Sequence, residues 1–103
     1  MVASSNLVIP TKALWEQGFH FMRQFVYILQ SLKDGGYYIG ETSDVESRIL
    51  FHNSGQQRST KNRIPFRLVL TEEYPSREQA RQRERQIKSW KGGEAFKNLI
   101  LGR

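Results

Sequence analysis

Two short hydrophobic runs joined by a glycine-containing turn constrain the fold of this chain more than any other feature. Residues 25–29 and 37–40 are rich in aromatic, β-branched and aliphatic side chains, a composition that favours strands. Between them stand Asp34, Gly35 and Gly36, which are turn-forming residues. Because a short connection of this kind joins antiparallel strands, the pattern predicts a β-hairpin.

A helix is predicted directly after the hairpin. Asp44 and the two hydroxyl residues before it offer side-chain oxygens that can cap a first helical turn. Residues 45–53 have helical spacing of their apolar positions, and Gly55 follows as a stop signal. Residues 56–63 are polar and basic, which indicates a loop.

The second half of the chain predicts one more strand and two helices. Residues 66–74 are rich in strand formers and are bounded by prolines. Ser76 caps a long helix that continues to about residue 91, where two glycines stop it. A short helix over residues 94–101 follows. The predicted fold class is therefore α+β, with a three-stranded antiparallel sheet flanked by helices in the order β-β-α-β-α-α.

Composition restricts the kinds of site and partner. With 103 residues the chain suffices for one domain, and 38% hydrophobic residues are typical of a globular protein. The absence of cysteine excludes a disulfide scaffold, a thiolate zinc site and a cysteine nucleophile. The net charge of +6 indicates a nucleic-acid backbone as partner. The alternative is that the positive charge serves solubility or weak RNA contact.

The N-terminal segment differs from the rest of the chain. Residues 1–22 show weak periodicity and no strong element, so we expect a poorly structured extension before a domain over residues 23–103. Met22 directly precedes the first strand-like run, which suggests an alternative translation start. No apolar run approaches the ~20 residues that span a bilayer, and no secretory signal is visible, so we expect a cytoplasmic protein without a membrane partner.

Two tyrosines of the hairpin are candidate functional residues. If Tyr27 and Tyr38 share a face of the sheet, their hydroxyls converge on neighbouring strands. A phenol is a poor base unless a cation or metal favours the phenolate. The alternative is that strand tyrosines simply pack in the sheet. Tyr37 points to the opposite face from Tyr38, which assigns it to packing.

The helix after the hairpin carries an arginine and a histidine on one face. Arg48 and His52 are four residues apart, so their side chains project in the same direction. A guanidinium can bind two phosphate oxygens, and an imidazole can move a proton. The alternative is a solvated helix face. We assign Asp44 to the helix cap rather than to metal binding.

Glu84 occupies an unusual place in the long helix. Ala80, Glu84 and Ile87 fall on one stripe, which the apolar members direct toward the core. A carboxylate there is costly unless a cation or hydrogen bonds compensate it. Either a metal ion or a salt bridge to Arg81 or Lys88 supplies that compensation, since both bases lie within helical reach.

These motifs together resemble the GIY-YIG nuclease superfamily. Phe25-Val26-Tyr27 followed by Tyr38-Ile39-Gly40 is similar to the paired motif that names the family, although its Gly-Ile-Tyr is here Phe-Val-Tyr. The stretch from Asp44 to His52 resembles the family's arginine and histidine helix, and the helix around Glu84 resembles its metal-site helix. The resemblance covers about residues 24–101 and is closest to the short standalone members. It is more distant to the N-terminal nuclease domain found in bacterial excinuclease.

The resemblance implies a metal-dependent endonuclease that hydrolyses a DNA phosphodiester in one step. The implied catalytic residues are Tyr27, Tyr38, Arg48, His52 and Glu84. Tyr27, aided by His52, would activate the water, while Arg48 and Tyr38 would steady the phosphate. Glu84 would bind one Mg²⁺ or Mn²⁺ at the leaving oxygen, and a single carboxylate with waters and phosphate oxygens suits Mg²⁺. Asn98 is a weak candidate for the late asparagine of the family.

The partner is expected to be nucleic acid, with DNA favoured over RNA. Candidate phosphate contacts are Arg58, Lys61 and Arg63 in the basic loop and Lys88 in the long helix, although these residues are equally consistent with solvated charge. No second domain is predicted for sequence targeting, which favours a structure- or damage-directed nuclease, as in DNA repair. The alternatives are a non-catalytic nucleic-acid-binding module and a protein that binds structured RNA.

Overall fold

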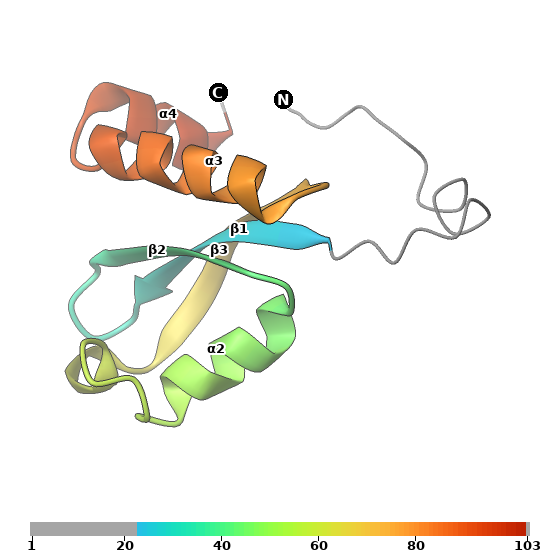
Figure 1. Cartoon of the computed structure of the whole chain (residues 1–103). Coiled ribbons are helices and arrows are strands. Elements are labelled where there is room, and N and C mark those ends of the chain that lie inside the picture. Colours follow the sequence, from blue (N-terminus) through green and yellow to red (C-terminus); the bar gives the residue numbers. More distant parts are fainter. Residues whose placement is uncertain (1–22, 103) are drawn as a thin grey trace, which may run out of the picture.

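A three-stranded antiparallel sheet in the order β2-β1-β3 forms the centre of the molecule (Figure 1). The computed structural model describes residues 23–102, so the predicted extension over residues 1–22, with Met22 as an alternative start, lies outside the described residues. The strands are β1 (Gln24–Ser31), β2 (Tyr37–Thr42) and β3 (Phe66–Tyr74). The predicted hairpin and the predicted α+β class are both confirmed.

Helices cover both faces of the sheet (Figure 1). The helices are α2 (Val45–Asn53), α3 (Arg77–Trp90) and α4 (Glu94–Leu101). Because side chains alternate along a strand, Val26 and Ile28 of β1 pack in one cluster with Ala80 and Ile87 of α3. The side chains of Tyr27 and Leu29 belong to a second cluster, which packs against α2. The central strand therefore supplies both cores.

The helices begin at the residues that the sequence predicts. The Asp44 side chain accepts a hydrogen bond from the Ser47 backbone N–H at 3.1 Å, which confirms Asp44 as the cap of α2. The Ser76 hydroxyl accepts one from Gln79 at 3.2 Å and begins α3. The predicted loop over residues 56–63 contains one short 3-10 turn, Lys61–Arg63, which its polar composition did not indicate.

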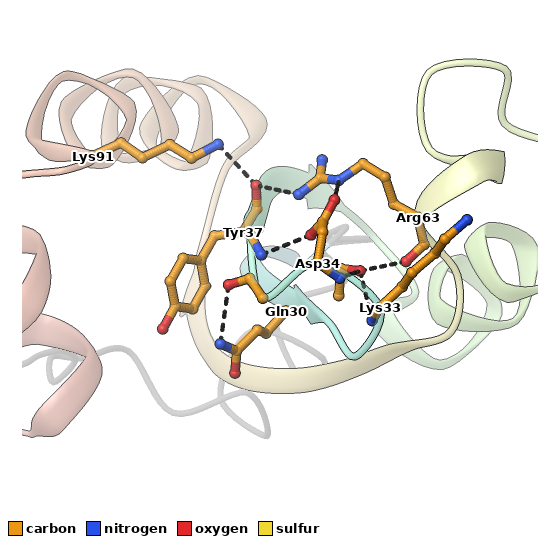
Figure 2. Close-up of polar contacts among 9 residues, drawn as sticks. Gln30, Lys33, Asp34, Tyr37, Arg63 and Lys91 are labelled. Atoms are coloured by element: carbon orange, nitrogen blue, oxygen red, sulfur yellow. Dashed lines mark hydrogen bonds and ion pairs between the residues drawn. The ribbon is translucent and has the colours of Figure 1, made fainter.

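A network of polar contacts fixes the turn between β1 and β2 (Figure 2). The Arg63 guanidinium donates from Nε to Asp34 Oδ2 at 3.0 Å. Asp34 in turn accepts from the Gly36 backbone N–H at 2.7 Å, and Lys91 Nζ donates to the Tyr37 carbonyl at 2.8 Å. Residues from the basic loop and from the end of α3 thus hold the hairpin turn in place.

A second network joins β3 to α3. Arg83 donates to both carboxylate oxygens of Glu72, from Nε at 2.8 Å and from a terminal nitrogen at 3.0 Å. The Tyr74 hydroxyl also donates to Glu72 at 2.8 Å. Burial, followed by this bond to Glu72, raises the pKa of Tyr74 to about 12. The Arg83 guanidinium also lies over the Trp90 ring, 5.1 Å from its centroid. Both partners are largely buried, so the ion pair fixes α3 against the edge of the sheet.

Removal of the Arg83 guanidinium should lower the stability of the domain measurably. We expect Arg83→Met to reduce the free energy of unfolding by about 1–3 kcal/mol, because Glu72 loses its charged partner in a partly buried position. Urea unfolding followed by circular dichroism measures this difference. Lys97→Met, an exposed change on α4, is the control and should differ from the unchanged chain by less than about 0.5 kcal/mol. Equal stability of the two variants would contradict the assignment.

Candidate active site

A buried hydrogen bond connects the central strand to α2. Tyr27 lies on the face of β1 that α2 covers, and His52 lies in the last turn of α2. The Tyr27 hydroxyl is 3.2 Å from His52 Nε2, and the two residues are 2% and 1% exposed. Each side chain therefore satisfies the polar group of the other where water is largely excluded.

Gly40 makes the position of the Tyr27 ring available. Tyr27 pairs with Gly40 across the two strands, and the ring lies over the glycine. A Cβ at position 40 would be 2.6 Å from the Tyr27 hydroxyl oxygen and 2.7 Å from Cζ. No rigid, buried ring tolerates such a contact without moving, so the glycine of the Tyr38-Ile39-Gly40 motif has a direct steric reason.

Tyr38 lies beside the same pair. Its ring centroid is 6.2 Å from that of Tyr27 and 4.6 Å from that of His52. The two tyrosines therefore share a face of the sheet, and the hydroxyl-bearing rings gather with the imidazole. Tyr37 packs against Phe96 on the opposite face, which confirms its assignment to packing.

Thr60 is a buried partner of His52 that the sequence did not indicate. His52 Nδ1 is 3.0 Å from the Thr60 hydroxyl oxygen, and Thr60 is 1% exposed. The hydroxyl can donate to the Gln57 carbonyl at 3.5 Å while it accepts from Nδ1–H. In that arrangement His52 Nε2 carries no proton and accepts from Tyr27. A single threonine in a polar loop has no sequence signature for this role.

Both members of the central pair are held neutral near neutral pH. Burial, then the neighbouring Tyr38, raises the pKa of the Tyr27 phenol well above its usual value. The charges of Glu84 and Glu41 raise it further, whereas Arg48 lowers it. Burial, followed by the charge of Arg48, lowers the pKa of His52. The arrangement is thus a neutral phenol that donates to a neutral imidazole.

Arg48 lies one helical turn before His52 and lines a groove at the edge of the sheet. Its guanidinium is 5.2 Å from the centroid of the Phe51 ring. The groove contains side chains from the strands, the start of α2 and the start of α3, namely Gln24, Glu41, Thr42, Ser43, Arg48 and Arg77. The predicted placement of Arg48 and His52 on one helix therefore gives different surroundings: Arg48 at a groove, His52 in the interior.

Glu41 is a second residue that the sequence did not indicate. Its side chain is 14% exposed and accepts from Gln24 Nε2 at 2.5 Å. Arg77 Nε and Arg81 Nε each lie 3.6 Å from the same carboxylate oxygen. Glu41 follows Gly40 directly, and this proximity to the motif was the only available signal.

The predicted stripe of α3 is confirmed. Ala80 and Ile87 are fully buried, and Glu84 between them is 17% exposed on its side chain. Lys88 Nζ lies 2.6 Å from Glu84 Oε2, so the salt bridge that the sequence offered as an alternative is formed. Arg81, the other predicted partner, contacts Glu41 instead. The influence of Glu84 on the Tyr27 pKa shows that the charge of the acid reaches the phenol.

The acidic residues suit a site with few protein ligands. Within residues 23–102, no group of three or more histidine, aspartate or glutamate side chains converges to hold a metal ion. Glu84 offers one carboxylate with a demonstrated need for a positive partner. One carboxylate completed by waters and phosphate oxygens is a ligand set that Mg²⁺ accepts. Glu84 therefore fits the group that the family resemblance implies.

The predicted phosphate contacts differ in their surroundings. Arg58 and Lys61 are exposed on the loop. Arg63 is occupied by Asp34 and by the Tyr37 carbonyl, which gives it a structural task (Figure 2). Lys88 is paired with Glu84. Asn98 is half-buried on α4, the helix that packs against α3.

Fold and site together define a small α+β domain that gathers two tyrosines, a histidine and an arginine near a partly buried glutamate. The family model described as the GIY-YIG catalytic domain matches residues 23–97. The chain belongs to the GIY-YIG family, a superfamily of nucleases. Within the described residues no helix is long and apolar enough to cross a membrane.

Several bacterial relatives resemble the chain over most of its described length. It is 47% identical over 68 residues to the UPF0213 protein BH0048 of Halalkalibacterium halodurans, which covers 65% of this chain and 71% of that one. It is 37% identical over 81 residues to the UPF0213 protein of Staphylococcus saprophyticus, covering 78% and 98%. The solution NMR structure of the UPF0213 protein from Bacillus halodurans shares 40% identity over 79% of this chain and 84% of that one, with a TM-score of 0.47.

Loss of the Thr60 hydroxyl should change the tautomer of His52. We expect Thr60→Val to leave Nδ1 without its acceptor, so that a proton on Nε2 becomes populated and the bond from Tyr27 weakens. Nitrogen-15 NMR of the imidazole distinguishes the two tautomers. Thr60→Ser keeps a hydroxyl and should retain the unprotonated Nε2. A Thr60→Val spectrum with the tautomer of the unchanged chain would contradict the role given to Thr60.

Proposed function

We propose that the chain is a metal-dependent endonuclease that hydrolyses a phosphodiester bond in DNA. The observation that carries this proposal is the buried hydrogen bond from Tyr27 to His52 Nε2, within the electrostatic reach of Arg48 and Glu84. Membership of a nuclease superfamily supports the reaction class. Two neutral groups in hydrogen-bond contact form a path for a proton, and the charged groups around them suit a phosphate and its counter-ion.

The proposed proton path runs from water through Tyr27 to His52. The water oxygen forms a bond to phosphorus while the bond from phosphorus to the leaving oxygen breaks. The proton of the water passes to the Tyr27 oxygen as the phenol proton passes to His52 Nε2. The raised pKa of Tyr27 supports this path over a stable phenolate. Since Tyr27 is only 2% exposed, binding of the phosphodiester must open a way for that water.

Arg48 and Tyr38 are proposed to hold the reacting phosphate. The Arg48 guanidinium lines the groove, where its planar donors match two phosphate oxygens. The Tyr38 ring is half-buried beside His52, so its hydroxyl is a further donor near the same place. Charge that develops on the phosphate oxygens would be stabilised by donors that are already in position.

Glu84 is proposed to bind Mg²⁺ or Mn²⁺. The ion would neutralise charge on the leaving oxygen. The Lys88 ammonium at 2.6 Å supports this assignment because it shows a cation on the carboxylate oxygen. Metal binding then requires Lys88 to move away, which leaves its ammonium available for a nearby phosphate.

The proposed substrate is DNA, cut at a structural irregularity or at damage. Arg58 and Lys61 are exposed cations that can contact phosphates beyond the groove, whereas Arg63 is held by the hairpin turn. The +6 charge supports a polyanionic partner in general.

A non-catalytic nucleic-acid-binding module is the second candidate function. The observation that favours it is the Glu84–Lys88 ion pair, since a carboxylate that is permanently neutralised binds no metal. This candidate predicts salt-sensitive binding without metal-dependent cutting.

Cleavage of nicked, branched and plain duplex DNA in Mg²⁺ or Mn²⁺ tests the proposal. We expect the full chain to cut at least one of these, and Glu84→Gln and Tyr27→Phe to lower the single-turnover rate by about 100-fold or more. Glu78→Gln removes an exposed carboxylate from the same helix and should cut like the unchanged chain. Circular dichroism establishes that each variant is folded.

Two results would contradict the proposal. Variants of Glu84 and Tyr27 that cut as fast as the Glu78→Gln control would remove both assigned roles. A full chain that binds DNA but cuts none of the three substrates with either metal would favour the binding module.

A further inference from the structure

Four positively charged residues form a continuous stripe on α3. Arg77, Arg81, Arg85 and Lys88 are spaced so that they fall within roughly 80° of arc at ~100° per residue. They extend over roughly 16 Å of the helix at ~1.5 Å per residue. All four residues are exposed. We call this set the α3 cation stripe.

The α3 cation stripe borders the candidate active site. Glu84 lies on the helix between the stripe and the buried Ala80 and Ile87. At the beginning of the helix, Arg77 lines the same groove as Arg48. A chain of phosphates that passes through the groove beside Arg48 would therefore meet the stripe as it continues along α3.

Glu41 holds two members of the stripe in place. Arg77 Nε and Arg81 Nε lie 3.6 Å from the same Glu41 oxygen, while their side chains remain 66% and 52% exposed. A guanidinium has five N–H donors, so one contact of this length leaves most of them directed to solvent. Pre-positioned guanidinium groups lose less conformational entropy when they bind a phosphate.

The surroundings of the basic loop point the same way. Arg63 of that loop is engaged by Asp34, and the loop contributes no side chain to the groove. The ordinary role of an exposed basic helix face is solvation. The stripe differs from such a face because its first member lines the groove and its length follows the helix that carries Glu84.

We propose that the α3 cation stripe binds the backbone of a DNA duplex on one side of the phosphate that lies in the groove. A length of roughly 16 Å corresponds to about five base steps at ~3.4 Å each along one strand. Contacts to phosphates position the duplex without reading its sequence. The inference rests on the proposed function for the place of the cut only, because binding through the stripe requires neither metal nor hydrolysis.

Salt-dependent binding of the full chain to a DNA duplex in EDTA tests the inference. Arg81→Gln with Arg85→Gln removes two stripe charges, and we expect the slope of log affinity against log salt to fall by about 2 × 0.9 = 1.8. At low salt the affinity should fall about 10-fold or more. Arg67→Gln with Lys97→Gln is the matched control, since it removes the same charge from β3 and α4. Its slope should stay close to that of the unchanged chain.

The outcomes separate this inference from the nuclease proposal. Equal slopes and affinities for the stripe variant and the control variant would overturn the stripe. So would a stripe variant that loses affinity for an RNA duplex while its affinity for the DNA duplex is unchanged. A chain that cuts no DNA in Mg²⁺, yet shows the expected loss of slope in EDTA, supports the stripe and removes only the catalytic proposal.

Discussion

The hydrogen bond between the Tyr27 hydroxyl and His52 Nε2 is the constraint on which the rest of the candidate site depends. It joins the central strand to α2 across the smaller core, and it fits only because Gly40 has no side chain beneath the ring. Thr60 satisfies the other imidazole nitrogen, so the ring has one orientation and one preferred tautomer. Packing and proton chemistry therefore place the same demands on these four residues.

The sheet separates this neutral pair from the charged groups that act on it. Tyr27 and His52 lie in the core under α2, whereas Glu84 belongs to α3, which packs on the other face. The charge of Glu84 nevertheless raises the pKa of the phenol, and that of Arg48 opposes it. The Glu72–Arg83 ion pair fixes α3 against β3 and so stabilises the position of Glu84 relative to the sheet. An interaction remote from the groove thereby contributes to the geometry of the site.

Local sequence patterns were sufficient to predict the elements and their order. The turn residues before Tyr37, the caps Asp44 and Ser76, and the helical spacing around Glu84 are all short-range signals, and each is confirmed. The roles of Thr60, Glu41 and Arg63 could not be predicted in this way. Each depends on partners distant in sequence or outside any regular pattern, and a single polar side chain carries no mark of such a partner. The catalytic assignments remain predictions.

The pH dependence of the single-turnover cleavage rate tests the central claim most directly. If His52 receives the proton through Tyr27, the rate should rise with a midpoint below pH 6.5, because burial lowers the pKa of His52, and stay level to about pH 9. A rate that continues to increase about tenfold per pH unit up to about pH 9 would mean that a phenolate or hydroxide is the reacting base. That result would contradict the account of Tyr27 and His52 as a neutral pair.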